Sequence, residues 1–208
     1  MNVRRHRRLA GALAVLWLAA GAAAAPPAPA APSLAGAPHE DAFTELLALL
    51  AARRHGRVSF TEVHEMAMLE RPLHSSGELL YEAPDHLEKR TLEPRPETLV
   101  LEHGVLTAHR GHRTHVLRLR DYPQVVPLVE SIRATLAGDR AALEHHFHVQ
   151  FSGDLGRWTL ELVPVDATVA RVVRDVRIAG EREAIRSVEI RQSDGDRSLL
   201  TIGAEVPP

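Results

Sequence analysis

Short segments in which apolar and polar residues alternate fill most of the chain. The segment RVSFTEVHEMAMLE, 57–70, alternates Val58, Phe60, Met66 and Met68 with mostly polar neighbours, which predicts one long strand. Further strands are expected at 76–83, 86–93, 97–102, 105–110, 112–120, 147–153, 157–164, 172–179, 184–192 and 197–203. Because turns rather than helical crossovers join most of them, these segments predict an antiparallel sheet of about eleven strands.

Two segments instead show the spacing of a helix. HEDAFTELLALLAARRHG, 39–56, carries acids early and arginines late, which predicts an amphipathic helix whose charges match its dipole. In YPQVVPLVESIRATLAGDRAALEHHF, 122–147, Gly138 is expected to end one helix and Asp139 to cap a second, short one. One face of the first of these helices carries four apolar residues: Val125, Val129, Ile132 and Leu136.

A sheet of this many strands tends to curl, and helices can cover its concave face. The pattern therefore predicts an α+β fold with a curved antiparallel sheet and space for a ligand beneath the helices. The candidate ligand contacts on one face are Phe60, Met66, Met68, Leu79, Tyr81, Trp158, Leu160 and Leu162. For any single one of these side chains, packing as core under the helices is favoured over ligand contact, since protein interiors are usually full. The pattern alone leaves both alternatives open.

The N-terminal segment is typical of export. Four arginines precede an apolar run, 9–25, which ends in an Ala-x-Ala cleavage pattern. We expect residues 1–25 to be a cleaved signal peptide, the Ala/Pro-rich residues 26–39 to be a linker and residues 40–208 to form one domain.

Composition narrows the classes of function. The net charge of −2 and the mixing of acids with arginines argue against a nucleic-acid partner. The chain has no cysteine, which removes disulfides and thiolate nucleophiles. It has 13 histidines, but His109 and His115 fall on different expected strands and His112 falls in the turn, so we predict no metal site.

An enzyme is the less favoured alternative. Ser75-Ser76-Gly77 is not the Gly-x-Ser-x-Gly turn of a hydrolase and does not lead from a strand into a helix. The aspartates fall mostly in expected turns, where aspartate is common. We therefore expect no catalytic residues and no cofactor.

Four motifs follow one another along the chain: RVSFTEVHE, GELLYEAPDHLEK, TLEPRPETLVLEHGVLTAH and LVESIRATLAGDRAAL. Taken in this order, they resemble the family of the periplasmic lipoprotein carrier LolA. The matching positions are Phe60-Thr61-Glu62, Gly77-Glu78-Leu79, Pro84, Pro94 and His103-Gly104-Val105-Leu106. The resemblance covers nearly all of 40–203. It implies an open β half-barrel with a helical lid, and a hydrophobic cavity that holds the acyl chains of a lipoprotein.

The resemblance also implies partners and a compartment. We expect a periplasmic monomer that receives an acylated lipoprotein or lipid-like cargo from an inner-membrane donor and passes it to an outer-membrane acceptor. One departure is Glu82-Ala83-Pro84, where the family has Lys-Arg-Pro and the arginine bonds to the lid. Because Ala83 has no side-chain donor, we expect a divergent LolA-related member with weaker lid closure.

A non-transporting assembly factor that binds a membrane partner protein is the alternative. Exposed sheet edges could serve such a factor. The sequence does not separate it from a carrier.

Overall fold

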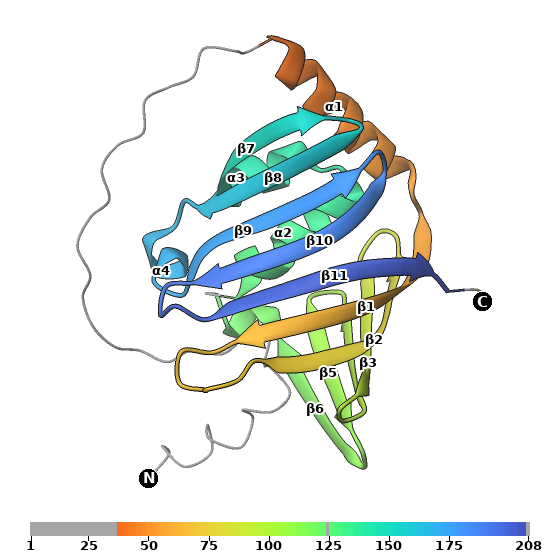
Figure 1. Cartoon of the computed structure of the whole chain (residues 1–208), viewed down its shortest axis with the longest axis vertical. Helices are drawn as coiled ribbons and strands as arrows, with labels where there is room; N and C mark the ends of the chain where they lie inside the picture. The colour runs from red at the N-terminus through yellow and green to blue at the C-terminus, as the bar shows by residue number, and fades with distance from the viewer. Residues whose placement is uncertain (1–36, 124, 207–208) are drawn as a thin grey trace.

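A computed structural model describes residues 37–123 and 125–206 and confirms the open antiparallel sheet of eleven strands (Figure 1). The strands lie in the order β6-β5-β4-β3-β2-β1-β11-β10-β9-β8-β7, and each neighbouring pair is antiparallel. The bounds are β1 His55–Glu65, β2 Leu73–Glu82, β3 His86–Glu93, β4 Glu97–Glu102, β5 Val105–Arg110, β6 Arg113–Arg118, β7 Phe147–Asp154, β8 Arg157–Pro164, β9 Val173–Glu181, β10 Ala184–Gln192 and β11 Arg197–Glu205. Two meanders, β1 to β6 and β7 to β11, therefore meet where β1 pairs with β11.

The helices are α1 Ala37–Ala52, α2 Val126–Ala137, α3 Arg140–His146 and α4 Ala167–Ala170, with a 3-10 turn at Leu119–Asp121. Gly138 follows α2 with a φ of 63°, and the side chain of Asp139 accepts a hydrogen bond from the Ala142 N–H at 3.0 Å. Both predicted helix boundaries are thus confirmed. The sequence reading missed α4, whose first turn is capped by the side chain of Asp166.

Two boundaries differ from expectation. The strand predicted over 57–70 ends at Glu65, because its ladder with β11 stops at the pair Glu65↔Arg197 and its ladder with β2 stops at His64↔Leu73. The Ala67 N–H donates instead to the side chain of Asp196. The second difference is at the N-terminal side of the domain, where α1 begins at Ala37, inside the predicted linker. The predicted signal peptide and residues 26–36 lie outside the described residues.

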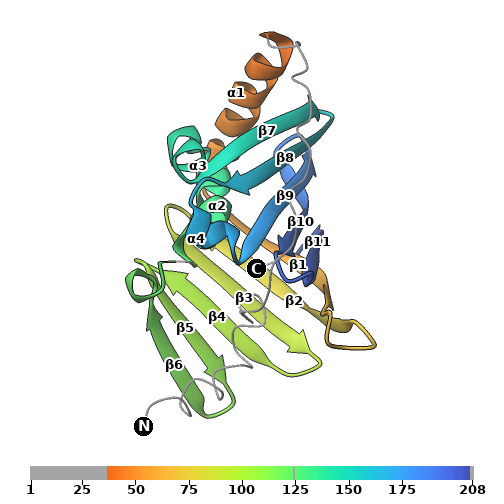
Figure 2. The ribbon, with the colours of Figure 1, turned by 90° about the vertical axis from the view of Figure 1, so that its left-hand side faces the viewer.

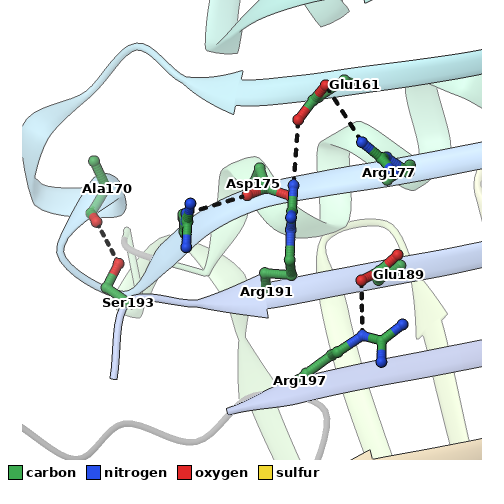
Figure 3. A network of polar contacts seen from close by, with 9 residues as sticks. Glu161, Ala170, Asp175, Arg177, Glu189, Arg191, Ser193 and Arg197 are labelled. Carbon is green, nitrogen blue, oxygen red and sulfur yellow. Dashed lines mark hydrogen bonds and ion pairs between the residues drawn. The ribbon is translucent and has the colours of Figure 1, made fainter. Parts of the chain in front are cut away.

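The two ends of the sheet diverge, and α2 and α3 lie on the side that they enclose (Figure 2). We call this side, which contacts α1, α2 and α3, the inner face, and the opposite side the outer face. On the outer face of β8 to β11, charged side chains pair across neighbouring strands (Figure 3). Arg191 contacts Asp175 at 2.6 Å and Glu161 at 3.3 Å, and Arg197 contacts Glu189 at 2.7 Å. Alternation along each strand places apolar neighbours on the inner face.

The main core lies on the inner face of β8 to β10. Its buried members include Leu46 and Leu50 of α1, Leu143 of α3, and Trp158 and Leu160 of β8. The indole N–H of Trp158 donates to the Arg182 carbonyl at 2.8 Å, so its one polar atom is satisfied. Helices and strands therefore fill this part of the interior with their own side chains.

Candidate functional site

A row of apolar side chains crosses the inner face of β2 to β6. Its members are successive cross-strand partners, which point to the same face of the sheet. They are Tyr81, Leu87, Leu101, Leu106 and Leu117. Tyr81, Leu101 and Leu106 are buried, whereas Leu87 and Leu117 are only half-buried. We call these five residues the leucine row.

Helix α2 lies over the leucine row and also contacts the main core. Its first turns bring Val126 and Val129 against the cluster of Leu101, Leu106 and Leu119, and both valines stay half-buried. Leu128, by contrast, is buried in the main core with α1 and β8. The helix therefore stands between a filled interior on one side and a partly exposed apolar surface on the other.

The inner face becomes polar with distance from the leucine row. The next row along the strands is mixed and contains Leu79, Lys89, Leu99, Ala108 and His115. The row beyond it contains Gly77, Thr91, Glu97, Arg110 and Arg113. An apolar surface that adjoins a charged one is suited to an amphiphilic molecule, which has one apolar and one polar end.

Glu62 and Lys89 form a mostly buried ion pair at this charged side. Their Oε2 and Nζ atoms lie 2.5 Å apart, and the ammonium group of Lys89 also sits 5.0 Å from the ring centre of Phe60. Ser198 and Ser75 donate hydrogen bonds to the same carboxylate at 2.8 and 3.2 Å. Burial alone would raise the pKa of Glu62, but the charge of Lys89 and these hydrogen bonds outweigh burial, so its pKa lies below the ordinary value.

A second pair, Glu97 and Arg110, is less well satisfied. One Arg110 nitrogen lies 3.0 Å from the Glu97 Oε2 atom. The buried Glu97 Oε1 and Arg110 Nε atoms have no hydrogen-bond partner among the described residues. Burial raises the pKa of Glu97 despite the neighbouring charges of Arg110 and Lys89.

The predicted ligand contacts do not all lie together. Phe60, Leu79 and Tyr81 are all on the inner face: Tyr81 is part of the leucine row, Leu79 lies in the next row and Phe60 pairs with Gly77 in the row beyond. Trp158, Leu160 and Leu162 are fully buried in the main core, where a ligand reaches them only if helices move. Met66 and Met68 lie in the β1–β2 loop, and the Met68 side chain is 77% exposed.

The predicted lid face of α2 is only half-buried. Val125 and Val129 pack against the cluster of Leu101, Leu106 and Leu119 and are half-buried. Ile132 and Leu136 are half-buried as well. The fully buried side of the helix instead carries smaller side chains, including Ser131 and Thr135, at 0% exposed each. Their hydroxyls donate to carbonyls of the same helix at 2.7 and 2.6 Å, which lets them be buried at low cost.

Sequence reasoning missed the residues that make up most of this surface. Leu87, Leu99, Leu101, Leu106 and Leu117 lie on strands that were predicted nearly to the residue. Their alternation with polar residues was visible, but which face of each strand points toward the helices depends on the register with the neighbouring strand. Glu62 and Lys89 could not be paired from a sequence in which they are separated by a whole hairpin.

A small pocket of about 100 Å³ lies on the outer face instead. It is lined by Leu80 and four charged residues: Arg57, Glu78, Glu88 and Arg90. The charged residues pair with one another, as in the 2.6 Å contact between Arg57 and Glu78. A site so small is unsuited to a hydrocarbon chain, so we assign the candidate site to the inner face.

The histidines are dispersed over the structure. His109 lies on β5, His112 in the following turn and His115 on β6. Within residues 37–123 and 125–206, histidine and carboxylate side chains do not gather into a group of three that could hold a metal ion. No helix of this part of the chain is both long and apolar enough to cross a membrane.

A family model matches most of the chain. Residues 35–206 match the family described as outer membrane lipoprotein carrier protein LolA-like. No curated protein matches the chain in sequence.

Several solved structures are similar in outline. A LolA superfamily protein from Nitrosomonas europaea aligns with a TM-score of 0.46 and 11% identity, over 82% of this chain and 93% of that one. A DUF1329 family protein from Desulfovibrio piger aligns with a TM-score of 0.46 and 7% identity, over 81% of this chain and 92% of that one. A chain of the Pseudomonas aeruginosa MucA/MucB complex aligns with a TM-score of 0.43 and 16% identity, over 80% of this chain and 59% of that one. At these similarities the structures say nothing about a ligand of this chain.

Proposed function

The chain belongs to the family of LolA-like outer membrane lipoprotein carrier proteins, and on that premise we propose that it is a periplasmic carrier or chaperone. In this proposal it binds the acyl chains of a lipoprotein or lipid-like cargo and hands the cargo toward the outer membrane. An inner-membrane donor would supply the cargo and an outer-membrane acceptor would take it. The proposal includes no cofactor and no chemical step.

One observation supports this function most directly: the leucine row beneath α2, in which Leu87 and Leu117 stay only half-buried on the inner face. Apolar side chains that remain exposed next to one another often mark a binding surface. We propose that acyl chains lie along this row, in contact with Leu79, Tyr81 and Phe60, and that Val125, Val129, Ile132 and Leu136 of α2 close over them. Trp158, Leu160 and Leu162 would join the site only when α2 and α3 move.

The energetics suit a shuttle. Burying hydrocarbon gains about 0.8 kcal/mol per methylene group, so a 16-carbon chain gains on the order of 12 kcal/mol before costs. Association costs roughly 4–15 kcal/mol in lost freedom of motion. The net affinity would therefore be moderate, and a tighter acceptor could withdraw the cargo.

The test places a charge on the inner face at the edge of the leucine row. We expect Leu79→Arg to reduce binding of the uncharged fluorescent probe N-phenyl-1-naphthylamine at least about tenfold, because a buried guanidinium opposes an apolar ligand. Leu80→Arg is the matched control, since Leu80 is the next residue on β2 and lies on the outer face. Circular dichroism would show that both variants are folded. Equal probe binding by Leu79→Arg, Leu80→Arg and the unchanged protein would contradict the proposal.

An assembly factor that binds a membrane protein is the second candidate. It is favoured by the open sheet, in which β6 and β7 are the end strands among the described residues, and by the exposed Val116 on β6. Native mass spectrometry of protein purified from its own host separates the two. Co-purified lipid supports the carrier, whereas lipid-free protein with a captured membrane protein supports the factor.

A further inference from the structure

The charged side of the inner face has features of a binding site for a polar group. Glu62, Lys89, Glu97 and Arg110 come from four different strands, and the acyl site proposed above grades directly into them. We call these four residues the charged set. Lys89 stands one row from the leucine row, Glu97 and Arg110 stand two rows from it, and Glu62 stands three rows from it. One amphiphilic molecule could therefore contact the leucine row and the nearer members of the set.

The charged set has no net charge. The two carboxylates balance the ammonium group of Lys89 and the guanidinium group of Arg110. Arg113 adds a cation farther out, on the exposed edge strand β6. A set with paired charges does not attract a phosphate or carboxylate as a cluster of arginines would.

The hydrogen-bonding capacity of the set is only partly used. Glu97 Oε1 is a buried acceptor and Arg110 Nε a buried donor, and neither has a partner among residues 37–123 and 125–206. Leaving such groups unsatisfied is costly, so a ligand that pairs with both would gain affinity. The side chain of Arg110 is 40% exposed, which leaves it room to turn toward a ligand.

A hydroxyl or amide group both donates and accepts hydrogen bonds, so it can serve Glu97 and Arg110 together. A phosphate or carboxylate head only accepts, and it would meet the carboxylates of Glu97 and Glu62 with the same charge. We propose that the charged set is a subsite for the uncharged, hydroxyl- or amide-bearing head of an amphiphilic cargo, and that it disfavours amphiphiles with an anionic head. This inference rests on the proposed acyl site.

The experiment compares two competitors with acyl or alkyl chains of equal length, 1-lauroylglycerol and dodecyl phosphate. Each competitor is added to the whole protein carrying bound N-phenyl-1-naphthylamine, at concentrations below the competitor's own critical micelle concentration. The loss of probe fluorescence measures displacement. We expect 1-lauroylglycerol to half-displace the probe at a concentration about tenfold lower than dodecyl phosphate, because its hydroxyls can donate to Glu97 Oε1 and accept from Arg110 Nε, whereas the phosphate offers Glu97 only like-charged acceptors.

Three variants test whether the charged set causes the preference for 1-lauroylglycerol over dodecyl phosphate. Glu97→Gln leaves the set with an excess positive charge, and we expect the preference to shrink to about threefold or to reverse. Arg110→Gln changes the charge in the opposite sense and should increase the preference, so the test survives if one variant fails to fold. Glu88→Gln is the matched control, because Glu88 is a paired carboxylate on the outer face of β3. It should leave the preference unchanged.

The outcomes separate the two proposals. If both competitors displace the probe equally, or if Glu97→Gln and Arg110→Gln keep the original preference, the head-group subsite is wrong while the acyl site stands. A preference for dodecyl phosphate also overturns the subsite. If the unchanged protein binds neither the probe nor either competitor, the proposed function itself fails.

Discussion

The two ends of the single sheet use the same inner face in different ways. Under α1 and α3, strands β8 to β10 bury a continuous core in which Trp158 and Leu160 are fully enclosed. Strands β3 to β6 form only a small cluster around Leu101, Leu106 and Leu119, and its neighbours Leu87 and Leu117 remain partly exposed. We call the first region the filled half and the second the open half.

The difference comes from the helices rather than from the strands. Both regions are antiparallel meanders of alternating sequence, but α1 packs on the filled half with its whole apolar side, including Phe43 stacked on Phe151 at 5.6 Å. A Cβ atom on Gly138 would lie 2.2 Å from the Leu47 carbonyl, so α2 packs closely against α1. The filled half thus holds α2 in place through its contact with α1. The open half keeps partly exposed apolar side chains that a ligand could cover.

The largest expected effect contrasts one substitution in the two halves. Leu160→Ala should lower the free energy of unfolding by about 4 kcal/mol, because it opens a cavity in a fully packed core. Leu99→Ala, on the inner face of the open half, should cost only about 1 kcal/mol, since Leu99 is already half-buried. Urea unfolding measures both. Equal losses would show that the open half is packed as tightly as the filled one, which would contradict the difference described between the two halves.

The next effect concerns the ion pair near the border of the two halves. Glu62→Gln should lower the free energy of unfolding by about 3 kcal/mol at neutral pH, because Lys89 loses its charged partner in a mostly buried position.

The pH dependence gives this prediction a sign. The pKa of Glu62 is lowered by folding, so its contribution is present at neutral pH and is lost as the pH falls through the lowered pKa. Between about pH 5 and about pH 3 the unchanged protein should therefore lose more stability than Glu62→Gln. Glu97, whose pKa is raised, acts in the opposite sense in both proteins and cancels from the comparison. Parallel stability curves would contradict the role given to Glu62.

The smallest effect is a difference in local opening. Helix α2 has one half-buried side, and Ala83 supplies no side-chain donor to hold it. Amides within 122–145 should therefore exchange hydrogen faster than those of β8 and β9. Hydrogen-exchange mass spectrometry measures this directly. Equally slow exchange would mean that α2 is held as firmly as the sheet.

Local patterns predicted most elements but not how they share an interior. β3, β4, β5, β8 and β10 match their predicted bounds, because alternation and turn residues act within a few residues. The strand expected to include Met66 and Met68 ended early, since pairing with β11 sets its length. Of the predicted ligand contacts, Leu79 and Tyr81 lie on β2, which pairs with the first strand of the open half, whereas Leu160 and Leu162 lie in the filled half.

The α+β class, the antiparallel meanders, the caps at Gly138 and Asp139 and the resemblance to LolA can all be predicted from local patterns, because they depend on periodicity, turn chemistry and the order of motifs along the chain. Which apolar residues are core, which stay partly exposed, and the contact between Glu62 and Lys89 depend on long-range packing. The burial of a side chain is set by which helix covers its strand, and the alternation of apolar and polar residues is the same whether or not a helix covers it.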